Sequence, residues 1–452
     1  MTDLLVTGAR LAGRDGRYDI AADRGHITRI TPARTDGDNA ATDAATVIDA
    51  AGALVSPPYV EPHVHLDTAL TAGQPRWNNS GTLWEGIAVW GERRATLDRA
   101  DVLARAEEVL RWYAARGVLH VRTHVDVTDP GLTALDALLE LRERVRDAVR
   151  LQVVAFPQEG IRSGPAGAVT RGRELLAEAA GRGVDAIGAI PHFEDTREDG
   201  VASLEDAVAL AETHGLMVDA HCDEIDDEQS RFVEVLAALA RSTGLGGRVT
   251  ASHTTAMGSY NGAYSYKLRR VLARAGVNLV CNPLTNLGLQ GRFDGYPKRR
   301  GLTQVAEMLA AGVNVAFGHD DVMDPWFPLG AADPLQIALT GIAAAQLTGP
   351  AQIAAAYEMV TERAARVLAL GDGYGIAVGR PADLLVLPAS SPLDVIRRQT
   401  RPLWVIARGR ILATTPQAPT DLTWPGTGTV PVDFVRADDD ADATWRHARL
   451  RR

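Results

Sequence analysis

The chain has 452 residues, a formal net charge of −10 and a composition typical of a soluble globular protein. Its length allows up to about three domains, although a (β/α)8 barrel alone takes about 250 residues. The negative charge argues against wide basic surfaces, so no nucleic-acid partner is expected.

The two cysteines, Cys222 and Cys281, exclude a disulfide framework and a Cys-rich zinc site. No apolar run is long enough to span a membrane. The first residues lack the basic start and the long apolar stretch of a signal peptide. We therefore expect a cytoplasmic enzyme without a membrane partner.

The first 53 residues contain short strand-like runs separated by turn glycines. The runs cover residues 4–6, 18–20, 26–30 and 46–49, and residues 34–46 predict an exposed loop of small and polar residues. Together they predict a small β region.

From residue 54 to about 370, apolar strand-like runs alternate with helical patterns. One helix is clear, because five apolar side chains between Val102 and Tyr113 fall on one helical face. Eight strand–helix units predict an α/β fold, a parallel (β/α)8 TIM barrel whose active site lies at the C-terminal ends of the strands. The eight runs cover residues 54–65, 119–125, 151–156, 186–190, 217–221, 248–253, 278–281 and 313–319.

The β pattern returns over residues 371–430, with strands expected at 382–387 and 403–407. We expect this region to pair with the N-terminal one, because the two ends of a barrel lie near each other. The glycine-rich residues 371–375 predict a turn, since no strand-to-helix context supports a phosphate loop. Residues 431–452, with an acidic run at 438–440 and a basic end, predict a solvated tail.

His63 and His65 lie near the end of the first strand-like run. Side chains alternate along a strand, so both imidazoles project to one face and can hold one metal ion. A single His-x-His is more often chance, and a lone strand histidine is more often packed or hydrogen-bonded than ligating. Here His221 and Asp320 end two further strands, and the four residues supply the nitrogens and the carboxylate that a mononuclear hydrolytic metal needs.

Glu224 follows His221 by three residues, so its carboxylate can lie beside a bound water without binding the metal. A divalent metal lowers the pKa of its water from about 15.7 to about 7, and a general acid/base must then move the proton. The alternative for Glu224 is a solvated loop carboxylate, because residues 223–228 form an acidic run. His253 is a candidate to hydrogen-bond the hydroxide, whereas Cys222 is expected to face the helix layer without a catalytic role.

Long stretches of the chain resemble the bacterial cytosine deaminases of the amidohydrolase superfamily. Such stretches are far more specific than a lone His-x-His, and the superfamily fold is a (β/α)8 barrel with a small β-sandwich built from both chain ends. The resemblance therefore implies a sandwich from residues 1–53 and 371–430 around a barrel at 54–370. The matching segments are residues 60–67, 80–83, 121–126, 155–160, 189–194, 221–232, 251–257, 289–294 and 317–322.

The resemblance implies roles for individual residues. His63, His65, His221 and Asp320 would bind one divalent metal, iron or zinc, with manganese also compatible with these ligands. Glu224 would carry a proton to the ring nitrogen N3, and His253 and Asp320 would act with it in catalysis. Gln158 would read the O2 and N1 edge of a pyrimidine, since an amide both donates and accepts, and the further pocket residues would be Leu83, Asp321 and Trp326. Residues 186–194 contain no lysine, which favours one metal over two.

Three positions depart from the family pattern: Thr285, Gly288, where a histidine is expected, and Gly295. They could widen the pocket. We therefore expect deamination of a free nucleobase, cytosine to uracil and ammonia, with isoguanine, 5-methylcytosine, creatinine-like and triazine rings as alternatives. Relatives assemble into oligomers, so a homo-oligomer is expected.

Three further alternatives have less support. A cyclic amidase would need the absent lysine, and a non-catalytic barrel would have no use for an intact set of ligands. Residues 192–194 match the His-x-Glu half of another zinc deaminase pattern. No Pro-Cys-x-x-Cys accompanies it, so we interpret this match as accidental.

Overall fold

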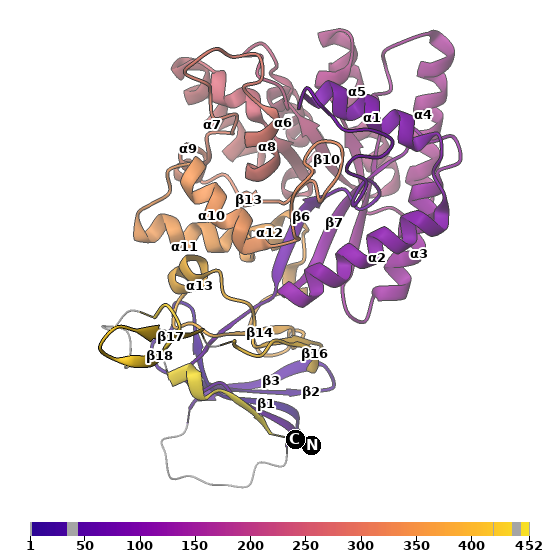
Figure 1. The fold of residues 1–452 in the computed structure, drawn as a ribbon. Coiled ribbons are helices and arrows are strands. Elements are labelled where there is room, and N and C mark those ends of the chain that lie inside the picture. Colours follow the sequence, from indigo (N-terminus) through magenta and orange to yellow (C-terminus); the bar gives the residue numbers. More distant parts are fainter. Residues whose placement is uncertain (1, 34–43, 419, 436–443, 452) are drawn as a thin grey trace. The chain divides into compact units, whose positions relative to one another are not determined.

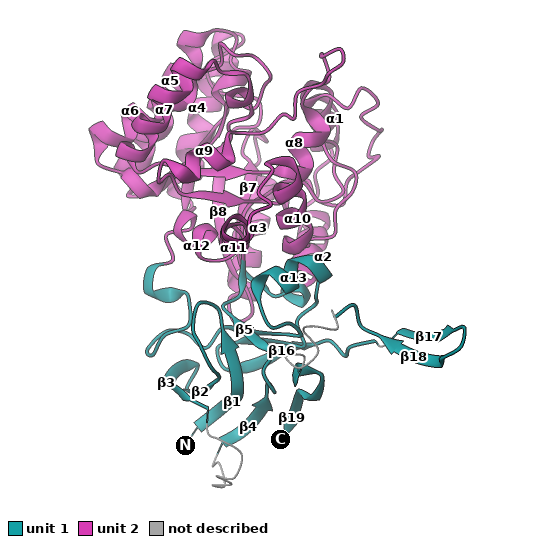
Figure 2. Ribbon diagram, turned by 90° about the vertical axis from the view of Figure 1, so that its left-hand side faces the viewer, with its two compact units in different colours: residues 1–59, 114–119, 371–452 teal, residues 60–113, 120–370 magenta. Residues whose placement is uncertain are grey.

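The computed structural model describes residues 2–33, 44–418, 420–435 and 444–451. The chain forms two compact units (Figure 2). The terminal unit comprises residues 1–59, 114–119 and 371–452, and the barrel unit comprises residues 60–113 and 120–370.

The barrel unit is built on eight parallel strands with helices around their outside (Figure 1). Neighbouring strands follow chain order, and backbone bonds close the ring: Asp320 N–H donates to His63 O at 2.8 Å and His65 N–H donates to Asp320 O at 3.0 Å. The predicted (β/α)8 barrel is confirmed. Its strands are β6 (Tyr59–Val64), β7 (Val118–Asp126), β8 (Arg150–Phe156), β9 (Ala186–Ala189), β10 (Met217–Cys222), β11 (Val249–His253), β12 (Asn278–Cys281) and β13 (Val315–Phe317).

The helices begin and end where the sequence supplies caps. Thr196 accepts from Asp199 N–H at the start of α5, and Gly215, with φ +68°, ends that helix. The predicted helix is α2, whose apolar face is buried from Val102 to Tyr113. The helices of this unit are α1 (Leu83–Arg94), α2 (Arg99–Arg116), α3 (Thr133–Val145), α4 (Ala166–Gly181), α5 (Arg197–His214), α6 (Phe232–Thr243), α7 (Gly262–Ala275), α8 (Pro283–Leu289), α9 (Val305–Ala310), α10 (Pro334–Ala344), α11 (Pro350–Glu358) and α12 (Glu362–Val367).

The run at residues 54–65, predicted as one barrel strand, is two strands in different sheets. Leu54–Ser56 forms β5, which pairs with strands of the terminal unit, and only β6 belongs to the barrel. Pro57 and Pro58 stand between them. Proline has no backbone N–H to donate to a sheet, so the pair interrupts the strand.

The terminal unit joins both chain ends in a nine-stranded sheet, as expected from the sequence. Strand β1 pairs with β2 and β4 along most of its length and with β5 at Arg10 and Leu11. On the other side of β5, Val55 faces Val386 of β14. Apart from β5, the strands are β1 (Thr2–Leu11), β2 (Tyr18–Asp23), β3 (His26–Pro32), β4 (Ala44–Asp49), β14 (Leu384–Leu387), β15 (Trp404–Ala407), β16 (Arg410–Thr414) and β19 (Arg449–Arg451).

The C-terminal segment differs from the predicted solvated tail. Strand β19 pairs with β4, with Leu450 opposite Ile48, and Trp445 is buried in the apolar core of the unit. Burial of a large aromatic side chain outweighs the charge of its neighbours. The hairpin of β17 (Thr420–Trp424) and β18 (Gly428–Val432) is exposed, and the acidic run at 438–440 lies outside the described residues.

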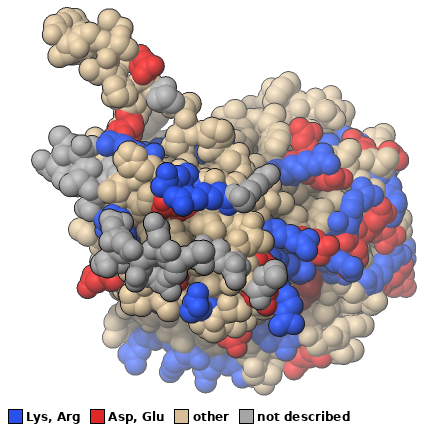
Figure 3. All heavy atoms as spheres, turned by 90° about the horizontal axis from the view of Figure 1, so that it is seen from below, with Lys and Arg blue, Asp and Glu red and all other residues tan. Residues whose placement is uncertain are grey.

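The glycine-rich segment after the barrel forms the turn that the sequence predicts. Residues Gly371–Gly373 form a short 3-10 turn rather than a phosphate loop, and α13 (Pro392–Arg398) follows β14. No helix in the described ranges has the length and apolar character needed to cross a membrane. On the right-hand part of the face drawn in Figure 3, Lys and Arg side chains lie among Asp and Glu side chains.

Candidate active site

The bonds that close the barrel also bring the first predicted ligands together. Because Asp320 pairs with the end of β6, its Oδ1 lies 3.2 Å from His63 Nε2 and 3.5 Å from His65 Nε2. His221, at the end of β10, brings its Nε2 to 3.0 Å from His65 Nε2. The structure thus gathers the four side chains that the sequence singled out.

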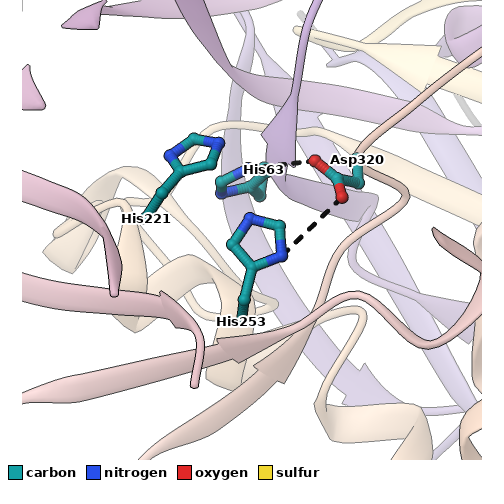
Figure 4. A group of neighbouring side chains, drawn as sticks. All are labelled: His63, His221, His253 and Asp320. Atoms are coloured by element: carbon teal, nitrogen blue, oxygen red, sulfur yellow. Dashed lines mark ion pairs between the residues drawn. The ribbon is translucent and has the colours of Figure 1, made fainter. Parts of the chain in front are cut away.

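His253 lies in the same group, and its Nδ1 is 3.8 Å from Asp320 Oδ2 (Figure 4). Within the described residues, two overlapping sets of donor atoms are close enough to share an ion. One set is His63, His221, His253 and Asp320, and the other is His63, His65 and His124. His124, on β7, is a candidate that the sequence reading gave no role.

The backbone is unusual where two of these side chains arise. His253 and Asp320 both have φ +69°, a left-handed conformation that residues other than glycine rarely adopt. Ser252 points into the barrel, so strict alternation would turn His253 outward. The left-handed residue ends the strand and lets the imidazole reach the pocket. Such strain is concentrated at functional sites.

Burial sets the charge states in this group. Loss of water, followed by the neighbouring imidazoles, lowers the pKa of His63 and His221 well below the ordinary value, and burial does the same for His65. The rings are therefore neutral and keep a lone pair for a metal. Burial and the nearby Glu224 raise the pKa of the Asp320 carboxyl.

The donor set fits a divalent metal. His63 Nε2 is buried and has no hydrogen-bond partner among the described residues, and it lies 3.2 Å from Asp320 Oδ1. Neutral imidazoles and one carboxylate are the ligands of catalytic zinc and iron sites. Unpartnered buried nitrogens beside a carboxylate are costly unless a proton or a cation lies between them.

A pocket opens beside this group and contains every predicted substrate-binding and catalytic residue. His63 lies beneath it and is fully buried. Leu289 also lines the pocket, and the sequence reading did not assign it a role. The lining residues are His65, Leu83, Gln158, His221, Glu224, His253, Leu289, Asp320, Asp321 and Trp326.

Glu224 is buried rather than solvated, and its Oε1 lies 3.2 Å from His253 Nδ1. Burial raises the pKa of its carboxyl. In the same run Asp223 accepts from the N–H groups of Phe232 and Val233 at the start of α6, whereas residues 227–229 are exposed. The acidic run is therefore only partly exposed to solvent. Asp223 is buried and holds the loop, and Glu224 is buried and lines the pocket.

The loops that carry Gln158 and Trp326 are fixed by buried carboxylates. Glu194 accepts from the N–H groups of residues 161, 162 and 163, just after Gln158. Asp324 accepts from Trp326 N–H at 3.0 Å. Glu194 belongs to the His-x-Glu match considered accidental, and its place in the structure is that of a loop anchor.

The three departures do not line the pocket. Thr285 is buried, and a Cβ added to Gly288 would face the Phe327 ring. Gly295 has nothing within 4 Å of such a Cβ. Cys222 is buried beside Asp223, with 3.7 Å between Sγ and Oδ2, and does not line the pocket either.

Comparison with known proteins assigns the chain to a family. The model of the amidohydrolase family matches residues 46–413. The chain belongs to the amidohydrolase family. It is 30% identical to the pterin deaminase of Rhizobium rhizogenes, with 88% of each chain covered. It is therefore a hydrolase acting on C–N bonds of ring compounds.

Two further relatives are similar over almost their whole length. The 5-methylcytosine deaminase of Klebsiella pneumoniae, solved with 5-fluorocytosine, is 46% identical; the match covers 94% of this chain and 100% of that one, with a TM-score of 0.88. The N-isopropylammelide isopropyl amidohydrolase of a Pseudomonas species is 29% identical, with 91% of this chain and 97% of the relative covered.

Proposed function

We propose that this amidohydrolase deaminates a free aminopyrimidine, replacing the C4 amino group of cytosine or 5-methylcytosine with oxygen and releasing ammonia. One observation carries the proposal: an amide, Gln158, and two buried acids, Glu224 and Asp321, line one small pocket beside the histidine–aspartate group. A pyrimidine presents matching donors and acceptors around its edge.

The polar residues divide the work of binding and proton transfer. Gln158 donates to O2 and accepts from N1–H, which fixes the ring in the pocket. Glu224 places a proton on N3, so that C4 becomes electrophilic. Its carboxylate then takes up the proton of the oxygen that adds to C4 and delivers it to the leaving amine, which departs as ammonia. Its buried setting and raised pKa suit a carboxyl that must hold a proton near neutral pH.

His63, His65, His221 and Asp320 would hold one divalent metal. When bound, such a metal lowers the pKa of water from about 15.7 to about 7 and so supplies the attacking oxygen at neutral pH. His253 hydrogen-bonds the oxygen that adds to C4. Iron and zinc are both compatible with these ligands.

The similarity to a 5-methylcytosine deaminase favours the methylated base over cytosine itself. Leu83, Leu289 and Trp326 give the pocket an apolar wall that suits a methyl group. One methyl group in an apolar pocket is worth about 10–200-fold in kcat/KM. We expect 5-methylcytosine to exceed cytosine by a factor in that range.

An assay of ammonia release tests the proposal. The purified, metal-loaded protein is supplied with cytosine, 5-methylcytosine, isoguanine and creatinine, and kcat/KM is measured for each. The proposal predicts turnover of the two aminopyrimidines with 5-methylcytosine first. Turnover of isoguanine or creatinine without turnover of either aminopyrimidine would contradict the proposed substrate class. Hydrolysis of a cyclic amide without release of ammonia would contradict the proposed reaction.

A further inference from the structure

A buried polar network lies behind His63, away from the pocket. His63 Nδ1 is 2.9 Å from Ser252 Oγ, and the Ser252 hydroxyl donates to Asp219 Oδ1 at 2.8 Å. Arg122 Nη1 donates to Asp219 Oδ2 at 2.8 Å. The four side chains come from β6, β11, β10 and β7, and all are fully buried. None of them except His63 has a part in the proposed reaction.

The order of donors in this network fixes the protonation of His63. Arg122 can only donate, and the Asp219 carboxylate paired with it can only accept. The Ser252 hydroxyl donates its single proton to Asp219, so its oxygen can only accept a hydrogen bond from His63 Nδ1–H. His63 therefore carries its proton on Nδ1 and keeps the lone pair of Nε2, the nitrogen that lies 3.2 Å from Asp320 Oδ1.

The same carboxylate also faces His124. Asp219 Oδ1 lies 3.4 Å from His124 Nε2, and the His124 ring is 3.9 Å from the His63 ring, centroid to centroid. By donor distances alone, His124 could join His63 and His65 around an ion. The Asp219 carboxylate next to His124 Nε2 favours a proton on that nitrogen over a lone pair directed at an ion.

We propose that Ser252 and Asp219 are positioning residues that select the metal ligands of this chain. They hold His63 in the tautomer that offers Nε2 to the metal, and Asp219 keeps His124 out of the ligand set. The inference rests on the proposed function, because it takes the metal to lie at the barrel mouth. Partners behind a ligating histidine set its tautomer and orientation, and their loss costs about 10–100-fold in metal affinity.

Cobalt(II) is the probe for the test, because its visible absorption reports the ligands directly. Wild type and the Ser252→Ala variant are titrated with Co²⁺ against a chelator. We expect the Co²⁺ affinity of Ser252→Ala to fall about 10–100-fold, with a changed absorption band. Ser252→Thr, which keeps the hydroxyl, should restore both.

Thr250→Val is the matched control. Thr250 lies two residues earlier on β11, is buried, and has a hydroxyl without a hydrogen-bond partner among the described residues. Its change should leave the Co²⁺ affinity and spectrum of wild type unaltered. An equal loss in Thr250→Val would show general loosening of the strand and would overturn the proposal.

Asp219→Asn tests the second half of the proposal. It should lower the Co²⁺ affinity at least as much as Ser252→Ala does, and replacing His124 with Phe in that background should change the absorption band again. If Asp219→Asn does not fold, the Ser252 comparison decides. Unchanged affinity in Ser252→Ala, in a protein whose wild type binds Co²⁺ and releases ammonia, overturns this inference alone. Failure of wild type to bind Co²⁺ overturns the proposed function.

Discussion

In the terminal unit, apolar side chains from both chain ends fill the interior, among them Leu4, Ile48, Val386 and Trp445. In the barrel unit, the interior contains histidines, carboxylates and Arg122, all buried. Apolar burial stabilises a fold directly, whereas each buried polar group costs free energy unless it is paired. From this difference we expect substitutions at the barrel mouth to change turnover and binding. We expect substitutions in the terminal unit to change stability.

The sharpest test of this contrast is Glu224→Gln. The change keeps the size of the side chain but removes the carboxyl that moves the proton, so we expect kcat to fall about 10²–10⁴-fold. Metal content, measured by elemental analysis, should stay the same. Glu228→Gln, in the exposed part of the same acidic run, is the control and should keep wild-type kcat. Turnover near the wild-type rate in Glu224→Gln would contradict the proton-transfer role.

Gln158→Ala should have a smaller effect, and mainly on binding. Loss of two hydrogen bonds to the ring costs about 1–3 kcal/mol, which raises KM roughly 5- to 150-fold. Steady-state kinetics with 5-methylcytosine measure the change. Gln229→Ala, at an exposed glutamine, should leave KM unaltered. An unchanged KM in Gln158→Ala would contradict the proposed contact between the Gln158 amide and the substrate.

Trp445→Ala should act on stability and leave the chemistry alone. Removing this buried ring from the terminal core costs about 3–5 kcal/mol in the free energy of unfolding, seen as a lower midpoint in urea. The kcat/KM of the folded fraction should match wild type. Trp424, 58% exposed on the β17–β18 hairpin, offers the control, since Trp424→Ala should change neither quantity. A large loss of kcat/KM in folded Trp445→Ala would break the contrast between the units.

The sequence was most informative where chemistry and strand alternation coincide. His63 and His65 are spaced for one face of a strand, and their grouping with His221 and Asp320 followed from the expected barrel. Glu224 could be singled out by its position three residues after His221, whereas Gln158 could be singled out only through the family resemblance. The structure places both in the pocket.

Other features were beyond the sequence because they depend on pairing between distant segments. Two prolines split the 54–65 run, but only sheet pairing shows that β5 joins β1 and β14. Burial of Trp445 depends on β19 pairing with β4. Asp219 could have been predicted from the sequence to lie near the site, because it stands two residues before His221 and so shares its face of β10. The role of Ser252 could not have been predicted in this way, because its hydrogen-bond partners lie on other strands.

The central claim is that one divalent metal at the barrel mouth is required for deamination. The direct measurement removes the metal with a chelator, titrates Zn²⁺ or Fe²⁺ back, and follows ammonia release from 5-methylcytosine. The account predicts no turnover in the metal-free protein and a linear recovery that saturates at one equivalent per chain. Full turnover without metal, or saturation only at two equivalents, would contradict it.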